Sequence, residues 1–139
     1  MCGMFALKTH PEKAAAEFRK EIELSPQDVD ARAQIALLDL TEGDFEEGRK
    51  FAKEAVKIEP GNFAAHVILS RLCLGAGDAE EGARQAEIAV KLAPESPDAH
   101  QVLSQCFARL KRRRDAERER TEWERLQAIA AKSEGTATP

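Results

Sequence analysis

Apolar residues recur along this chain at the three- and four-residue spacing of helices that bury one face. Between residues 28 and 60 they fall into two runs, one over 29–42 and one over 45–58. Gly43 separates the runs and suits the left-handed residue at a helix C-terminus, and Pro60 follows the second run. The pattern therefore predicts a pair of helices joined by a tight turn.

The helix-pair pattern returns with an offset of 34 residues. The segment VKIEPGNFAAHVILS at 56–70 reappears as VKLAPESPDAHQVLS at 90–104. The closing prolines and the helix caps keep the same offset: Pro26, Pro60 and Pro94, and Asp28, Asn62 and Ser96. A period of this length is the signature of stacked helical repeats. We expect a partial leading repeat at 1–28, followed by full repeats at 29–62, 63–96 and 97–130.

The third repeat is expected to end differently from the first two. Its turn is the basic run KRRR at 111–114, and no proline closes the helix that follows. That helix carries a thin apolar stripe that includes Trp123, Leu126 and Ile129, which predicts a long, heavily charged capping helix. Residues 131–139 have little to bury and are predicted to form a disordered tail.

Small residues at equivalent places complete a likeness to a known family. The first helices of the pairs carry Ala36, Ser70 and Ser104, and the second helices carry Ala14, Gly48, Gly82 and Ala116. Together with the period and the prolines, these residues resemble the tetratricopeptide repeat. The family's tryptophan is replaced by Arg32, His66 and His100, and its tyrosine by Asp39, Cys73 and Phe107. The resemblance implies an all-α fold, an α-solenoid whose antiparallel helix pairs form a right-handed superhelix.

The resemblance also implies a concave groove, lined by the first helix of each pair, that binds a peptide or amphipathic segment of a protein partner. The implied groove residues are Asp30, Ala33, Gln34, Leu37, Ala64, Val67, Ile68, Arg71, Asp98, Gln101, Val102, Gln105 and Arg109. Their centre is apolar, which suits a ligand anchored by aliphatic side chains. Alternatively, some of Leu37, Leu40 and Leu74 pack between helices. The expected function is a non-catalytic protein-interaction scaffold.

One subclass of the family grips the terminal carboxylate of chaperone tails with lysine, asparagine and arginine side chains. The corresponding places here hold Ala33, Leu37, Ile68, Asp98 and Val102. None of these side chains supplies the required cation or amide. The resemblance therefore does not imply chaperone-tail binding.

Composition and charge narrow the class of partner. Of the 139 residues 42% are hydrophobic and 33% are charged, with one Trp and no Tyr, which favours helices over strands. The net charge of -4 gives no case for nucleic acid, and carboxylates interspersed after residue 114 neutralise the basic run. No apolar window is long enough for a membrane span. Cys2, Cys73 and Cys106 form no CxxC pair, which fits thiols in a reducing compartment, and we expect the cytoplasm.

We expect no catalytic, metal or cofactor site in this chain. The sequence contains no HExxH, GxGxxG or P-loop motif. His66 and His100 hold equivalent places in neighbouring helices, about 10 Å apart by the usual helix spacing. A shared metal would need closer approach and more ligands. We therefore expect the two histidines to pack where the family has its tryptophan.

Counting back along the repeat places Met1 inside a helix rather than at its start. We expect the chain to be a segment of a longer repeat protein, with a short N-terminal cap as the alternative. Met4, Phe5 and Leu7 would then form an apolar end that invites a homo-oligomer. Two alternatives to groove binding stay open: self-assembly through this end, and recruitment as the C-terminal part of a larger enzyme or secretion component.

Overall fold

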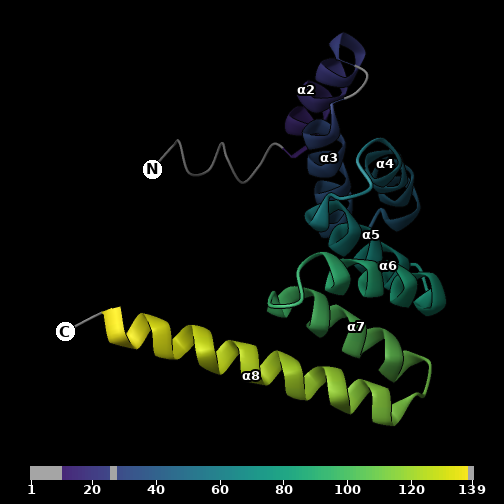
Figure 1. The fold of residues 1–139 in the computed structure, drawn as a ribbon. Helices are drawn as coiled ribbons and strands as arrows, with labels where there is room; N and C mark the ends of the chain where they lie inside the picture. The colour runs from purple at the N-terminus through teal and green to yellow at the C-terminus, as the bar shows by residue number, and fades with distance from the viewer. Residues whose placement is uncertain (1–10, 26–27, 138–139) are drawn as a thin grey trace.

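The computed structural model describes residues 11–25 and 28–137, and in these residues every regular element is an α-helix (Figure 1). The all-α solenoid predicted from the sequence is confirmed. The helices are α2 (Pro11–Leu24), α3 (Val29–Glu42), α4 (Phe45–Ile58), α5 (Phe63–Gly75), α6 (Ala79–Leu92), α7 (Pro97–Arg109) and α8 (Arg113–Ala137).

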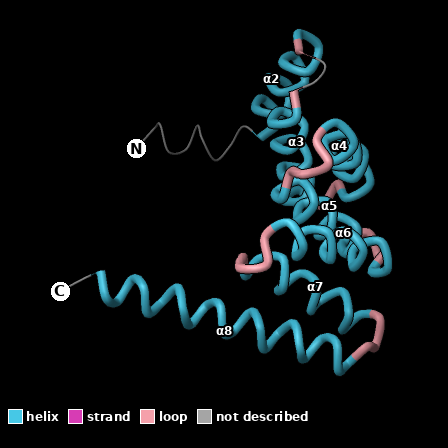
Figure 2. The backbone as a smooth tube through the Cα atoms, in the orientation of Figure 1, coloured by secondary structure: helices cyan, strands magenta, loops and turns pink. Residues whose placement is uncertain are grey.

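The helices stack in chain order, each packed on the one before it, and short loops connect them (Figure 2). The helix pairs α3/α4, α5/α6 and α7/α8 make the most extensive contacts, and α2 packs on α3 ahead of them. Each pair touches only its neighbours, as expected of a solenoid whose stability is a sum of local and nearest-neighbour terms. The core is correspondingly a series of small apolar clusters rather than one centre.

Side-chain caps fix several of the helix starts. Asp28 Oδ1 accepts the Ala31 N–H at 2.9 Å, Asn62 Oδ1 accepts the Ala65 N–H at 2.9 Å, and Asp78 Oδ1 accepts the Glu81 N–H at 3.2 Å. Asp44 and Ser96 also occupy the position before a helix, but neither makes a side-chain capping hydrogen bond. In α7 the first helical residue is Pro97, whose missing N–H costs nothing at that position.

Glycines on the second helices let neighbouring helix pairs approach closely. A Cβ atom at Gly48 would lie 2.6 Å from Leu72 Cδ2, and one at Gly82 would lie 3.0 Å from Cys106 Sγ. A serine hydroxyl ties the facing helix at the same level: Ser70 Oγ donates to the Gly82 carbonyl at 2.7 Å. The small residues that carried the family likeness are therefore explained by close helix contact.

The last helix is longer than the sequence predicted. α8 continues to Ala137, so the prediction of a disordered tail is wrong for residues 131–137. The physical reason is visible in the repeat pattern: the prolines that end α4 and α6 at Pro60 and Pro94 are replaced by Ala128, the best helix former. In Figure 1 the C-terminal part of α8 extends well past α7.

Candidate peptide-binding surface

The first helices of the three full repeats form one row. Within residues 28–137, α3 contacts α5 and α5 contacts α7, whereas no contact of that extent joins α4 to α6 or α6 to α8. A stack that is closer along one edge than the other curves toward the closer edge. The side chains that α3, α5 and α7 present on this inner side are called the groove face below.

Most of the residues predicted for the groove do reach the surface. The exposed ones are Asp30, Gln34, Leu37, Ala64, Asp98, Gln105 and Arg109, and the half-buried ones are Ala33, Ile68, Arg71 and Gln101. They come from all three helices of the row, which places residues far apart in sequence on one surface. The groove face is thus an accessible surface of mixed polar and aliphatic character.

The groove prediction is wrong for two residues, Val67 and Val102, because they belong to the core. Val102 is only 1% exposed and lies in the apolar cluster with Leu103, Cys106 and Phe107. Val67 is 7% exposed and packs with Ala89 and Ala99. Val102 packs against α6 of the preceding pair, and Val67 packs against α6 of its own pair and against α7, where a ligand cannot reach them.

The aliphatic part of the groove face centres on Leu37 and Ile68. Leu37 on α3 is 42% exposed. Ile68 on α5 is half-buried against the cluster that contains Leu69 and Leu72. Leu40 and Leu74 pack against core clusters, as the alternative interpretation of these leucines held.

The arginines of the groove face differ from most arginines elsewhere in the molecule. Seven arginines away from this face pair with carboxylates of the same chain, in the pairs Arg19–Glu47, Arg32–Glu54, Arg49–Asp78, Arg84–Glu81, Arg112–Asp115, Arg118–Asp115 and Arg125–Glu122, whereas Arg113, Arg114 and Arg120 on α8 pair with none in the described part of the chain. Arg71 and Arg109 have no carboxylate partner among the described residues. The groove face therefore offers guanidinium groups whose hydrogen-bonding capacity is free.

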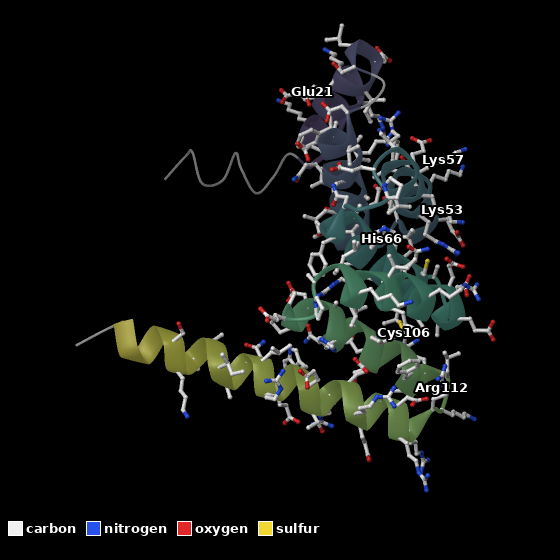
Figure 3. The ribbon with its side chains drawn as sticks, viewed as in Figure 1. Glu21, Lys53, Lys57, His66, Cys106 and Arg112 are labelled. Carbon is white, nitrogen blue, oxygen red and sulfur yellow. The ribbon has the colours of Figure 1, made fainter. Side chains whose placement is uncertain are left out.

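The two repeated histidines serve packing between repeats. His66 Nε2 lies 2.7 Å from the Pro60 carbonyl and Nδ1 lies 2.8 Å from Gln85 Oε1. His100 makes the equivalent contacts, at 2.8 Å to the Pro94 carbonyl and 2.7 Å to Glu119 Oε1. Each buried ring joins the start of its helix to the preceding turn and to the second helix of its own pair. Figure 3 shows His66 and Cys106 within the stack, whereas Lys53 and Lys57 stand at its outer edge.

Two buried groups have pKa values raised far from their ordinary values, Asp39 and Cys106. Burial, together with the nearby Glu47 and Asp44, raises the pKa of Asp39 to about 6, although Arg19 opposes the shift. Burial also raises the pKa of the Cys106 thiol to about 11. A thiol with a raised pKa is a poor nucleophile at neutral pH, so Cys106 behaves as a packing residue.

Sequence reasoning missed a surface hollow of about 250 Å³ between α7 and α8, beside the groove face. Its lining residues are Gln101, Ser104, Gln105, Ala108, Arg120 and Trp123. In the two preceding repeats the residues equivalent to Arg120 and Trp123 are alanines, all buried under the next repeat: Ala52, Ala55, Ala86 and Ala89. The loss of alanine at these places is the sequence signal that could have found the hollow.

No group of three or more His, Cys, Asp or Glu side chains in residues 11–25 and 28–137 is placed to hold a metal ion. None of the described helices is long and apolar enough to cross a membrane. Met4, Phe5 and Leu7, predicted to form a self-associating end, lie outside the described residues.

Comparisons with known proteins agree with this architecture. The tetratricopeptide repeat model matches residues 39–106. No curated protein sequence matches the chain. Among solved structures, the segment of MamA from residue 41 to its end, from Desulfovibrio magneticus RS-1, aligns with a TM-score of 0.81 at 22% identity, covering 89% of this chain and 70% of that one. Another crystal structure of MamA aligns with a TM-score of 0.82 at 14% identity, covering 89% and 72%. At these identities the structural likeness speaks for the fold.

Proposed function

Because residues 39–106 match the tetratricopeptide repeat model, we propose that the chain is a non-catalytic protein-interaction scaffold that binds a peptide segment on its groove face. The proposal concerns the surface of α3, α5 and α7. The fold and the family match support an interaction scaffold in general, and the groove face is the surface on which the ligand is expected.

One observation carries the proposal. The groove face combines an exposed aliphatic side chain, Leu37, with two arginines, Arg71 and Arg109, that have no carboxylate partner among the described residues. Most of the other arginines, apart from three on α8, pair with carboxylates of the chain. Exposed apolar groups and unpaired guanidinium groups both gain free energy when a complementary ligand covers them.

The chemistry of the face indicates the kind of ligand. Leu37 and Ile68 are suited to aliphatic anchors of an extended peptide or an amphipathic helix. Arg71 and Arg109 favour carboxylates or backbone carbonyls on the same segment. Asp30 and Asp98, at the beginnings of α3 and α7, favour a cation at the other margin of the ligand.

The experiment starts by selecting a ligand. A phage-displayed library of random twelve-residue peptides is selected on the immobilised chain, and the enriched peptides are synthesised. Their affinity is then measured for the native chain and for Leu37→Glu. Leu92→Glu is the matched control, because Leu92 on α6 is also 42% exposed but lies off the groove face.

We expect Leu37→Glu to weaken peptide binding at least tenfold, whereas Leu92→Glu leaves it within twofold. The physical reason is the loss of an apolar contact worth about 1.5–3 kcal/mol when fully buried. Equal effects of the two variants would contradict a site on the groove face. Failure to select any peptide would contradict the scaffold function itself.

A further inference from the structure

The strongest unexplained feature is the hollow between α7 and α8. It opens beside Gln101 and Gln105 of the groove face and is closed on its other side by Arg120 and Trp123 of α8. A following repeat would bury this surface, as the second and third repeats bury the alanines at the equivalent places. Here it holds polar groups and an aromatic ring instead.

Among the side chains around the hollow, hydrogen-bond donors outnumber acceptors. Arg120 is exposed and has no carboxylate partner among the described residues. Glu117 and Glu124 lie one turn before and after it on α8, yet neither comes within 4.0 Å of the guanidinium to form an ion pair. The arginines nearest in sequence, Arg118 and Arg125, are both paired.

Trp123 adds a second, independent observation. Its indole Nε1–H is covered by protein atoms and has no hydrogen-bond partner among the described residues. A covered donor without an acceptor carries a desolvation cost of about 1–3 kcal/mol. A ligand oxygen that entered the hollow, after a small shift of the covering side chains, would relieve that cost.

We propose that this hollow is a subsite for an acidic side chain of the bound peptide, held by Arg120 and by the amides of Gln101 and Gln105. The inference rests on the proposed peptide-binding function and specifies the chemistry of one end of the ligand. Guanidinium and carboxylate groups form strong charge-assisted pairs, and the glutamine amides complete the donor set.

The position of the hollow predicts a spacing in the ligand. It lies one repeat beyond Ile68, and neighbouring helices in such stacks are about 10 Å apart. An extended peptide advances about 3.3 Å per residue. The acidic residue should therefore stand about three residues from an aliphatic anchor.

The peptide selection described above tests the inference when it is run in parallel on Arg120→Gln. Peptides selected on the native chain should be enriched in Asp or Glu about three residues from an aliphatic residue. Selection on Arg120→Gln should keep the aliphatic preference and lose the acidic one. Arg114→Gln is the control, because Arg114 is exposed at the start of α8, outside the hollow, and should give the native pattern.

A selected peptide and its Glu→Gln copy then give the energetic test. The native chain should bind the copy roughly tenfold to a hundredfold more weakly, and Arg120→Gln should bind both peptides alike. Trp123 is the sole tryptophan of the chain, so its fluorescence should change when the acidic peptide binds. Thermal unfolding monitored by circular dichroism checks that the variants remain folded.

Each failure has a distinct meaning. Peptides that bind without any acidic preference, or an acidic preference that survives in Arg120→Gln, would overturn the subsite while leaving the groove function intact. An equal loss in Arg114→Gln would also overturn it, because the preference would then be one of overall charge. If no peptide is selected at all, the proposed function fails first and the subsite with it.

Discussion

Equivalent positions hold different residue types at the two internal boundaries between repeats and at the C-terminal end of the stack. Where another repeat follows, Ala55 and Ala89 are fully buried beneath it. At the end, Trp123 stands in the equivalent place and lines an open hollow. In this chain, alanine at these places leaves room for the following repeat, and the residues that replace alanine at the C-terminal end of the stack line a hollow instead.

The turn within the third pair also differs from the turns within the first two. Gly43 and Gly77 adopt the left-handed conformation, with φ of 84° and 88°. The third pair places Lys111 at φ 63°, which costs a non-glycine residue free energy. The end of the stack therefore departs from the repeat both where the next repeat would dock and in its own turn.

The largest expected effect on stability comes from placing tryptophan, the residue type of Trp123, at the equivalent position of an internal boundary. Ala89→Trp should destabilise the fold by about 3 kcal/mol or more, because Ala89 is fully buried against Val67 and Ala99 and the backbone would have to move. Urea unfolding followed by circular dichroism measures the change. A loss of unfolding free energy below about 1 kcal/mol would show that the boundary is loosely packed, and it would contradict the contrast drawn between the internal boundaries and the C-terminal end.

The next effect concerns Asp39, which occupies a place that holds buried Cys73 and Phe107 in the other repeats. Its pKa of about 6 lies above the ordinary value of 3.8, so the folded state binds the proton more tightly than the unfolded state. The destabilisation is full above pH 6 and disappears as the pH falls from 6 through 3.8.

Asp39→Asn should accordingly stabilise the chain by about 1–2 kcal/mol at pH 7.5, below the limit of about 3 kcal/mol that a two-unit shift allows. At pH 4 the stabilisation should be close to zero. Urea midpoints of the two proteins across this pH range give the measurement. A stabilisation independent of pH would contradict the role assigned to the buried carboxyl.

A smaller gain is expected at the third turn. Lys111→Gly should restore the residue found at the two internal turns and stabilise the fold by about 1 kcal/mol, because glycine adopts positive φ without steric cost. The midpoint of thermal unfolding should rise. Gly77→Lys, the reverse change in the second pair, should lower it by a similar amount.

The smallest expected effect on stability tests the long last helix. Ala128→Pro supplies the residue that closes α4 and α6, and should end α8 near residue 126. Residues 127–133 are exposed, so the free energy of unfolding should change by less than about 1 kcal/mol. Helical circular dichroism should fall by an amount that matches the residues lost. An unchanged spectrum would contradict the helical extension to Ala137.

The sequence was sufficient for the repeat architecture because each device of the repeat is local. Pro60 and Pro94 end helices, Asp28 and Asn62 begin them, and Gly48 and Gly82 allow close packing at one fixed offset. Agreement among independent local signals is what makes a fold predictable.

The candidate site was only partly predictable, because exposure on a helix depends on what packs beside it. Family correspondence placed Val67 and Val102 on the groove face, but the neighbouring second helices cover them. The loss of alanine at the places of Arg120 and Trp123 signals a change at this end of the stack, but the hollow itself depends on which surfaces α8 leaves uncovered. The helical residues 131–137 lack apolar side chains other than alanine, so an argument from burial could not detect them.

The most direct test of the central claim is to map a selected peptide onto the isotope-labelled chain by NMR. Amide and side-chain shifts should change along α3, α5 and α7, including Leu37, Ile68 and Arg71, and at Arg120 and the indole of Trp123 on α8. The outer faces of α4 and α6, including Lys53 and Leu92, should stay unchanged. Shift changes centred on α4 and α6, with the groove face silent, would contradict the account.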